Sequence, residues 1–345
     1  MKRKYILGAV LLAACLCTSG CKAEEPLVSG SHPPVTLSSW VVSWDEASGW
    51  KEYDKNKNQW DSLSYFAAYF DEKGHLVLPK TFEKRTKAGK DFYLTFVNDV
   101  HPAKGKAIEK DTAVLQQVLR TEEARRNHAK EILAMAEQVG ADGIEIDYER
   151  IMKANAPDLA KKFANFTQLL FLESIPAHKK VRIILEPSMP MDLPYSSGPE
   201  YVVMAYNLYG LHSGPGPKAD GAFIRKTIQK MEALPGKKGL AFSNGGCVWE
   251  DAGFFGLQKG KAKFITEETA VKLAKDHQVQ PERDEASWAL HFSYKEKDHT
   301  YEVWYADKET MEAWMTLASK EGISSLYIWR LGGNVSLKQL DKGNS

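Results

Sequence analysis

The stretch Asp142-Gly-Ile-Glu-Ile-Asp-Tyr-Glu149 alternates apolar and acidic residues. Such alternation predicts a β-strand, because successive side chains of a strand point to opposite faces of the sheet. One face carries two isoleucines and a tyrosine, and the other carries three acids spaced about 6.6 Å apart, namely Glu145, Asp147 and Glu149. On a solvated edge strand this row is ordinary, but inside a parallel barrel it is costly and points to function.

Short β-rich runs alternate with helical patterns on both sides of this strand. The expected strands are residues 35–44, 63–70, 92–98, 143–148, 181–187, 201–209, 239–243 and 325–331. The clearest helices are expected at residues 122–139, 156–172, 221–233, 267–275 and 308–320. Gly140 is suited to end the first of them. Eight strands alternating with helices predict an α/β fold, a (β/α)8 TIM barrel. A doubly wound open sheet is the competing architecture, but no G-x-G-x-x-G follows an expected strand.

The beginning of the chain predicts export. Met1-Lys2-Arg3-Lys4 is basic, and the apolar run that follows is too short to span a bilayer as a permanent helix. Leu12-Ala13-Ala14-Cys15 resembles a bacterial lipobox, and Cys21 ends a weaker second candidate. Residues 1–20 are therefore interpreted as a lipoprotein signal peptide with lipidation at Cys15 or Cys21, and a plain cleaved signal is the alternative. This places the protein in the bacterial cell envelope, lipid-anchored and facing outside the cytoplasm.

Two further parts follow the signal. Residues 21–34 are polar and rich in Pro, Gly and Ser, which is typical of a flexible tether. Residues 35–340 contain the barrel, and about 247–305 is too long for an ordinary connection between the seventh and eighth strands. Runs at 287–294 and 300–304 predict a hairpin in a small insertion there. Cys247 is the only cysteine beyond the leader, so the domain contains no disulfide framework.

Composition excludes several classes of protein. The chain has 345 residues, 46 basic and 45 acidic side chains and 43% apolar residues, so disorder is excluded and a large core is available. A formal net charge of +1 argues against nucleic acid as a partner. Aromatic residues make up 11%, which suits carbohydrate binding. The nine histidines show no H-E-x-x-H spacing, so no metal or other cofactor is expected. We expect a monomer.

Three carboxylates in a low-dielectric lumen repel one another, so the pKa of at least one is expected to rise. A carboxyl group that stays protonated near neutral pH can act as a general acid in glycoside cleavage. The acidic row therefore indicates glycosidase chemistry.

The quoted stretch resembles the D-G-x-D-x-D-x-E signature of glycoside hydrolase family 18, the chitinase and N-acetylglucosaminidase family. Met204-Ala-Tyr-Asn207 stands where that family has M-x-Y-D, and Tyr327-Ile-Trp-Arg-Leu-Gly332 resembles its eighth strand. Phe92-Tyr-Leu-Thr-Phe-Val-Asn98 and Tyr301-Glu-Val-Trp-Tyr-Ala-Asp307 resemble the bacterial branch with spore-cortex-lytic enzymes of the YaaH and SleL type. The resemblance covers nearly the whole chain after the leader.

The resemblance implies a role for each of four residues. The family retains anomeric configuration without an enzyme nucleophile, because the substrate's own N-acetyl group attacks the anomeric carbon. Glu149 would protonate the leaving oxygen, and Asp147 would orient the acetamide and stabilise the charged intermediate. Tyr206 would donate a hydrogen bond to the acetamide, and Trp329 would form the floor under the sugar. Barrel core is the alternative reading of Tyr206 and Trp329.

Further residues are expected at the same face as substrate-binding candidates. They are Trp44, Asn98, Glu145, Glu186, Met204, Asn207 and Trp329. Glu145 and Asn207 both depart from the family pattern, which has Asp at each position.

The sequence thus predicts a glycoside hydrolase that cleaves β-1,4 linkages next to N-acetylglucosamine in chitooligosaccharide, peptidoglycan or the N-glycan core. A non-catalytic carbohydrate-binding lipoprotein on the same barrel is the alternative. An ordinary two-carboxylate glycosidase is a third reading.

Overall fold

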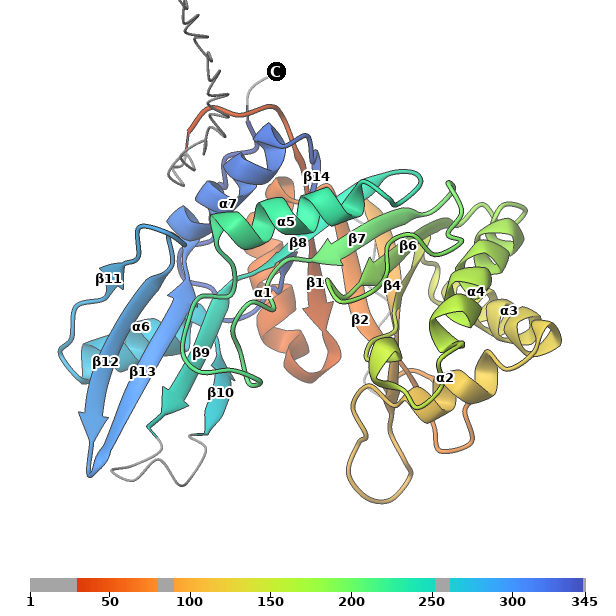
Figure 1. Ribbon diagram of the computed structural model, residues 1–345, viewed down its shortest axis with the longest axis horizontal. Helices are drawn as coiled ribbons and strands as arrows, with labels where there is room; N and C mark the ends of the chain where they lie inside the picture. The colour runs from red at the N-terminus through yellow and green to blue at the C-terminus, as the bar shows by residue number, and fades with distance from the viewer. Residues whose placement is uncertain (1–29, 80–89, 252–260, 344–345) are drawn as a thin grey trace, which may run out of the picture.

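The computed structural model describes residues 30–79, 90–251 and 261–343 (Figure 1). Cys15, Cys21 and the predicted signal peptide lie outside these residues, as does most of the predicted tether. None of the helices within the described ranges is long and apolar enough to cross a membrane.

Eight parallel strands close into a barrel. Their order is β1 (Thr36–Val42), β2 (Ser62–Phe70), β4 (Asp91–Val100), β5 (Gly143–Asp147), β6 (Lys180–Leu185), β7 (Glu200–Met204), β8 (Lys238–Ser243) and β14 (Ser325–Trp329). β1 pairs with both β2 and β14, which closes the sheet on itself. A short strand, β3 (Leu76–Val77), adds to the end of β2. The predicted TIM barrel is confirmed.

Helices cover the outside of the barrel (Figure 1). They are α1 (Glu46–Asn56), α2 (Thr112–Val118), α3 (Glu122–Val139), α4 (Leu159–Ser174), α5 (Gly221–Met231) and α7 (Lys308–Lys320). The main apolar core lies between these helices and the outward faces of the strands. α3 begins after Thr121, whose hydroxyl accepts a hydrogen bond from the Ala124 amide at 3.1 Å, and it ends at Gly140 with φ of 68°. Gly140 thus takes the left-handed conformation that its predicted role at the end of the helix requires.

An antiparallel sheet is inserted between β8 and β14 and lies beside the barrel (Figure 1). It contains β10 (Ala262–Ile265), β9 (Gly245–Glu250), β13 (His299–Ala306), β12 (Leu290–Glu296) and β11 (Glu282–Arg283), in that order. α6 (Glu267–Asp276) packs on it and gives it a small core of its own. The insertion predicted between the seventh and eighth strands is confirmed, and its predicted hairpin corresponds to β12 and β13.

The structure differs from the sequence prediction mainly at element ends. α1 and α2 were not predicted, because only a few of their residues are buried and their apolar stripes are therefore weak. The first strand ends at Val42 rather than at residue 44, and the sixth ends at Met204 rather than at residue 209. After each of these two strands the polypeptide leaves the sheet at the carboxyl end of the barrel. Trp44 and Tyr206 therefore lie on connecting segments at that end.

Candidate active site

β5 presents its acidic face to the barrel interior, as the alternation predicts. On the opposite face, Ile144 and Ile146 are fully buried in the main core. Tyr148 lies on that face too, and its hydroxyl is 2.7 Å from Nε2 of His128 on α3. These contacts show that Ile144, Ile146 and Tyr148 face outward. The acids alternate with them along the strand and therefore face the barrel interior.

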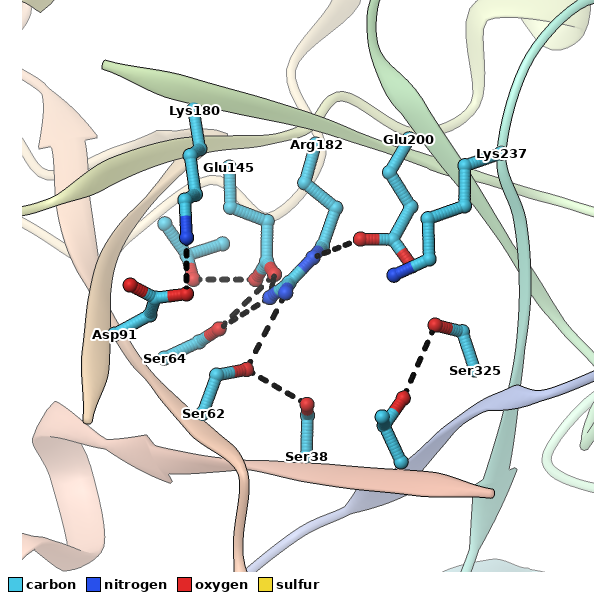
Figure 2. Close-up of polar contacts among 12 residues, drawn as sticks. Ser38, Ser62, Ser64, Asp91, Glu145, Lys180, Arg182, Glu200, Lys237 and Ser325 are labelled. Atoms are coloured by element: carbon cyan, nitrogen blue, oxygen red, sulfur yellow. Dashed lines mark hydrogen bonds and ion pairs between the residues drawn. The ribbon is translucent and has the colours of Figure 1, made fainter. Parts of the chain in front are cut away.

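Glu145 lies deepest in the interior and is completely buried. Its Oε2 is 3.1 Å from Nη1 of Arg182, on the adjacent strand β6, and accepts a hydrogen bond from Ser64 at 3.0 Å (Figure 2). Its Oε1 accepts hydrogen bonds from the Thr95 hydroxyl at 2.7 Å and from the indole of Trp40. Every oxygen of this carboxylate is thus occupied by protein groups. The side chain lies buried below the open end of the barrel, and its contact with substrate stays a prediction.

Arg182 completes this polar floor. Its Nε is 3.4 Å from Oε2 of Glu200, and its guanidinium carbon lies 3.7 Å from the ring centroid of Tyr93 and 4.7 Å from that of Tyr327. Burial raises the pKa of the Tyr93 hydroxyl to about 12, although the neighbouring Arg182 lowers it. The floor therefore pairs the buried carboxylate of Glu145 with the buried cation of Arg182. No local sequence pattern predicts this ion pair.

Glu149 lies at the opposite, open end of the row, two residues beyond the end of β5. Its side chain is 20% exposed, and Oε1 is 2.7 Å from Nζ of Lys110. Lys110 also lies 4.0 Å from Asp99 and 5.3 Å from the ring centroid of Phe66. Burial lowers the pKa of Lys110, but the charges of Glu149, Asp147 and Asp99 outweigh burial and raise it overall. Lys110 was not predicted as a site residue.

Asn98 holds the backbone at this point. Its side-chain oxygen accepts a hydrogen bond from the Glu149 amide at 2.9 Å, and its Nδ2 donates to the carbonyl oxygens of Glu149 and Asp111, each at 3.1 Å. The residue is completely buried at the end of β4. Asn98 therefore positions Glu149, and its contact with a sugar stays a prediction.

Asp147 lies between the two neutralised acids and is buried, with 6% exposure. Its Oδ1 has no hydrogen-bond partner among the described residues. Burial and then the charge of Glu149 raise its pKa well above the usual 3.8, against the opposing effect of Lys110. The expectation that at least one carboxyl of the row has a raised pKa is confirmed at Asp147.

Aromatic side chains surround the mouth. The Trp329 ring centroid lies 5.0 Å from that of Phe66 and 6.3 Å from that of Trp44, which is 61% exposed. Tyr206 is half-buried, and its pKa is raised well above the usual value by burial and then by the charge of Asp147. Met204 is 3% exposed and packs inside the barrel below these rings, and its contact with substrate stays a prediction.

Glu186 follows β6 and is brought to the same end of the barrel. Its Oε2 accepts a hydrogen bond from the Arg150 amide at 2.7 Å, and its pKa is raised by burial and then by the charge of Glu149. Glu186 is therefore close enough to feel the charge of Glu149, and its contact with substrate stays a prediction.

A cavity of about 180 Å³ lies beside the carboxylate row, between the barrel and the inserted sheet. Tyr206, Asn207 and Trp329 line it on the barrel side, and Phe264 lines it from β10. Lys218, which the sequence analysis did not single out, is also part of its wall. Within the described part of the chain, no group of three His, Cys, Asp or Glu side chains is placed to hold a metal ion.

Comparison with known proteins gives one relative in sequence and many in fold. No family model matches the chain. A protein named as a sporulation-specific glycosylase, YdhD of Bacillus subtilis (strain 168), is 26% identical over 234 residues, which are 64% of this chain and 54% of that protein. The match thus spans about half the length of the relative.

Two solved structures illustrate the likeness in fold. The spore cortex-lytic enzyme SleL of Bacillus cereus superimposes with a TM-score of 0.73 at 18% identity, covering 88% of this chain and 72% of that one. A mutant class V chitinase from Nicotiana tobaccum in complex with NAG4 superimposes with a TM-score of 0.65 at 14% identity, covering 88% and 95%. These findings confirm the resemblance that the sequence predicts.

Proposed function

Because this chain resembles glycoside hydrolase family 18 in sequence and in fold, we propose that it is a glycosidase acting next to N-acetylglucosamine by substrate-assisted, retaining catalysis. The observation that carries the proposal is the placement of Asp147 and Glu149. One carboxyl is buried with a raised pKa, and the next is held at the barrel mouth by Asn98. The carboxyl end of the strands is where barrel enzymes hold their active sites.

Each residue has a chemical role in this proposal. Glu149, partly open to solvent, donates a proton to the departing glycosidic oxygen. Asp147 lies beneath it with an unpartnered oxygen, which is free to accept a hydrogen bond from the acetamide N–H of the substrate. That contact fixes the acetamide oxygen for attack on the anomeric carbon and stabilises the positive charge that develops.

Tyr206 and Trp329 orient the same sugar. The raised pKa of Tyr206 keeps its hydroxyl protonated, so it can donate a hydrogen bond to the acetamide oxygen. Trp329 offers an aromatic face, supported from below by Trp40 at 5.7 Å between ring centroids. Trp44 extends this surface outward, and Glu186 and Asn207 complete the wall. The chemistry needs no metal, since the substrate supplies its own nucleophile.

The proposed substrates are N-acetylated glycans: chitooligosaccharides, peptidoglycan strands or the N-glycan core. The names of the relatives support this class, since one is a spore cortex-lytic enzyme and another is a chitinase in complex with NAG4. The protein is further proposed to act as a monomer, attached to the outer side of the membrane by a lipid on Cys15 or Cys21. Metabolic labelling with a radioactive fatty acid, with and without both cysteines, tests the attachment.

Hydrolysis of a chromogenic chitobioside and of chitotetraose tests the activity. Replacing a general acid lowers the rate by about 10² to 10⁴, so Glu149→Gln is expected to abolish most turnover while the fold is retained. Glu123→Gln, an exposed change on α3, serves as the matched control and is expected to keep full activity. Hydrolysis of a glycoside that lacks the 2-acetamido group would contradict the mechanism and favour an enzyme nucleophile.

A non-catalytic glycan-binding protein is the second candidate. Two observations favour it: the ion pair between Lys110 and Glu149, which occupies an oxygen of the proposed acid, and the neutral Asn207. Binding of chitotetraose by the wild-type protein without any hydrolysis would establish this reading.

A further inference from the structure

The described residues that line the cavity beside the carboxylate row carry positive charge only. Two of its lining residues are basic, Lys218 and Arg330, and none of the described lining residues is acidic. The charge of Arg330 is already balanced, because its Nη1 lies 2.6 Å from Oδ2 of Asp45. Lys218 is therefore the cation that distinguishes this cavity.

Lys218 is 8% exposed and lies on the segment between β7 and α5. Its ammonium group lies 4.1 Å from the ring centroid of Phe264, which also lines the cavity. Its polar neighbour is the thiol of Cys247, which is completely buried. Burial lowers the pKa of Lys218, and no carboxylate within the described ranges forms an ion pair with it.

A buried ammonium group is costly unless an anion pairs with it. A thiol is a weak hydrogen-bond partner, and an aromatic ring gives only partial compensation. A negative group that enters the cavity from outside would supply the compensation that these neighbours do not. Asn207, exposed on the same wall, adds an amide that can donate a hydrogen bond and carries no charge to repel an anion.

The cavity also shares two lining residues with the candidate active site. Tyr206 and Trp329, which would hold the reacting N-acetylated sugar, line it as well. A group in the cavity therefore belongs to the same sugar or to its neighbour in the chain. At about 180 Å³ the cavity accommodates a small substituent rather than a whole additional glycan.

Building on the proposed function, we propose that this cavity is a subsite for a carboxylate carried by the N-acetylated glycan, with Lys218 as the residue that recognises it. The substrate class is thereby narrowed from neutral chitooligosaccharides to glycans in which an acidic substituent accompanies the acetamido group. N-acetylmuramic acid, with its lactyl carboxylate, has this chemistry.

The test compares three tetrasaccharides: one of alternating N-acetylglucosamine and N-acetylmuramic acid, the same compound with its carboxylates converted to carboxamides, and chitotetraose. The wild-type protein is expected to show kcat/KM about 10- to 100-fold higher for the carboxylate than for the carboxamide, the loss typical of a hydrogen bond to a charged group. Lys218→Met is expected to abolish this preference for the carboxylate over the carboxamide. Lys263→Met, an exposed change on the adjacent β10, is expected to preserve it.

Equal kcat/KM for carboxylate and carboxamide in the wild-type protein would overturn the proposal, even if Lys218→Met proved too unstable to assay. An unchanged ratio in a folded Lys218→Met variant would overturn it too. If none of the three compounds is hydrolysed, the proposed function fails, and calorimetric titration of the wild-type protein then decides the subsite separately. Tighter binding of the carboxylate than of the carboxamide supports it, and equal binding refutes it.

Discussion

Replacing Arg182 with methionine is expected to destabilise the barrel strongly. Both partners of the floor ion pair are buried, with side-chain exposures of 4% for Arg182 and 0% for Glu145. Removing one partner of such a pair typically costs about 3–5 kcal/mol, because the other charge stays buried without compensation. Glu145 keeps hydrogen bonds from Trp40, Ser64 and Thr95, so we expect the lower end, about 3 kcal/mol.

The measurement is urea unfolding followed by tryptophan fluorescence, in which lower stability appears as a lower midpoint at an unchanged slope. Lys180→Met is the matched control, since Lys180 lies on the same strand and forms the more exposed ion pair with Asp91 (Figure 2). Its loss is expected to cost less than about 1 kcal/mol.

A double-mutant cycle separates the ion pair from the packing of Arg182. In a Glu145→Gln background the buried charge of Glu145 is absent, and Glu200 keeps its ion pair with Lys237 at 3.2 Å. Arg182→Met is therefore expected to cost about 2 kcal/mol less than in the wild type. If Arg182→Met destabilised the protein no more than Lys180→Met, or if the coupling energy were zero, the assigned role of the floor would be refuted.

Three further predictions concern the mouth. Lys110→Met removes the ion pair that holds the Glu149 side chain at 2.7 Å. The kcat for chitotetraose is expected to fall about 10²-fold, as for a misplaced catalytic group, and an unchanged kcat would contradict this. Asp147 has a raised pKa in the folded protein, so the folded state retains a proton that the unfolded chain releases as pH rises above the usual 3.8. Asp147→Asn is therefore expected to stabilise the protein at pH 7 but not at pH 3, and urea unfolding that shows the same difference at both pH values would refute the assignment. Asn98→Ala removes the amide that holds the Glu149 backbone and is expected to cost about 1–3 kcal/mol in unfolding free energy and about tenfold in kcat; steady-state kinetics with unchanged kcat would show that this contact is dispensable.

Period-two and helical patterns were sufficient to predict the barrel, because each strand and most helices bury one regular face. The acidic row on β5 was predictable for the same reason, as was its position among the strands. α1 was not, because it contributes little besides Trp50 and Tyr53 to the core and so leaves no clear periodic signal.

The partners of the acids could not be predicted from their own segment. Arg182 comes from the next strand and Lys110 from a preceding connection, and both meet the row only after the barrel closes. The depth at which each side chain lies along the barrel axis could not be predicted from the sequence either. Glu145, Asn98 and Met204 lie near the expected face in sequence, yet all three are buried. Lys218 lies in no recognised motif, and only the folded chain brings it to a cavity wall on which none of the described lining residues is acidic.

The position of the two chain ends also determines which way the open end of the barrel faces. The Val35 amide, just ahead of β1, donates a hydrogen bond at 2.8 Å to the carbonyl oxygen of Lys342, so both ends of the described chain leave from the amino-end side of the strands (Figure 1). Glu149 and the aromatic mouth lie on the other side. A surface that held the protein by the segment before Val35 would therefore lie behind the barrel, and the mouth with Glu149 would face away from that surface.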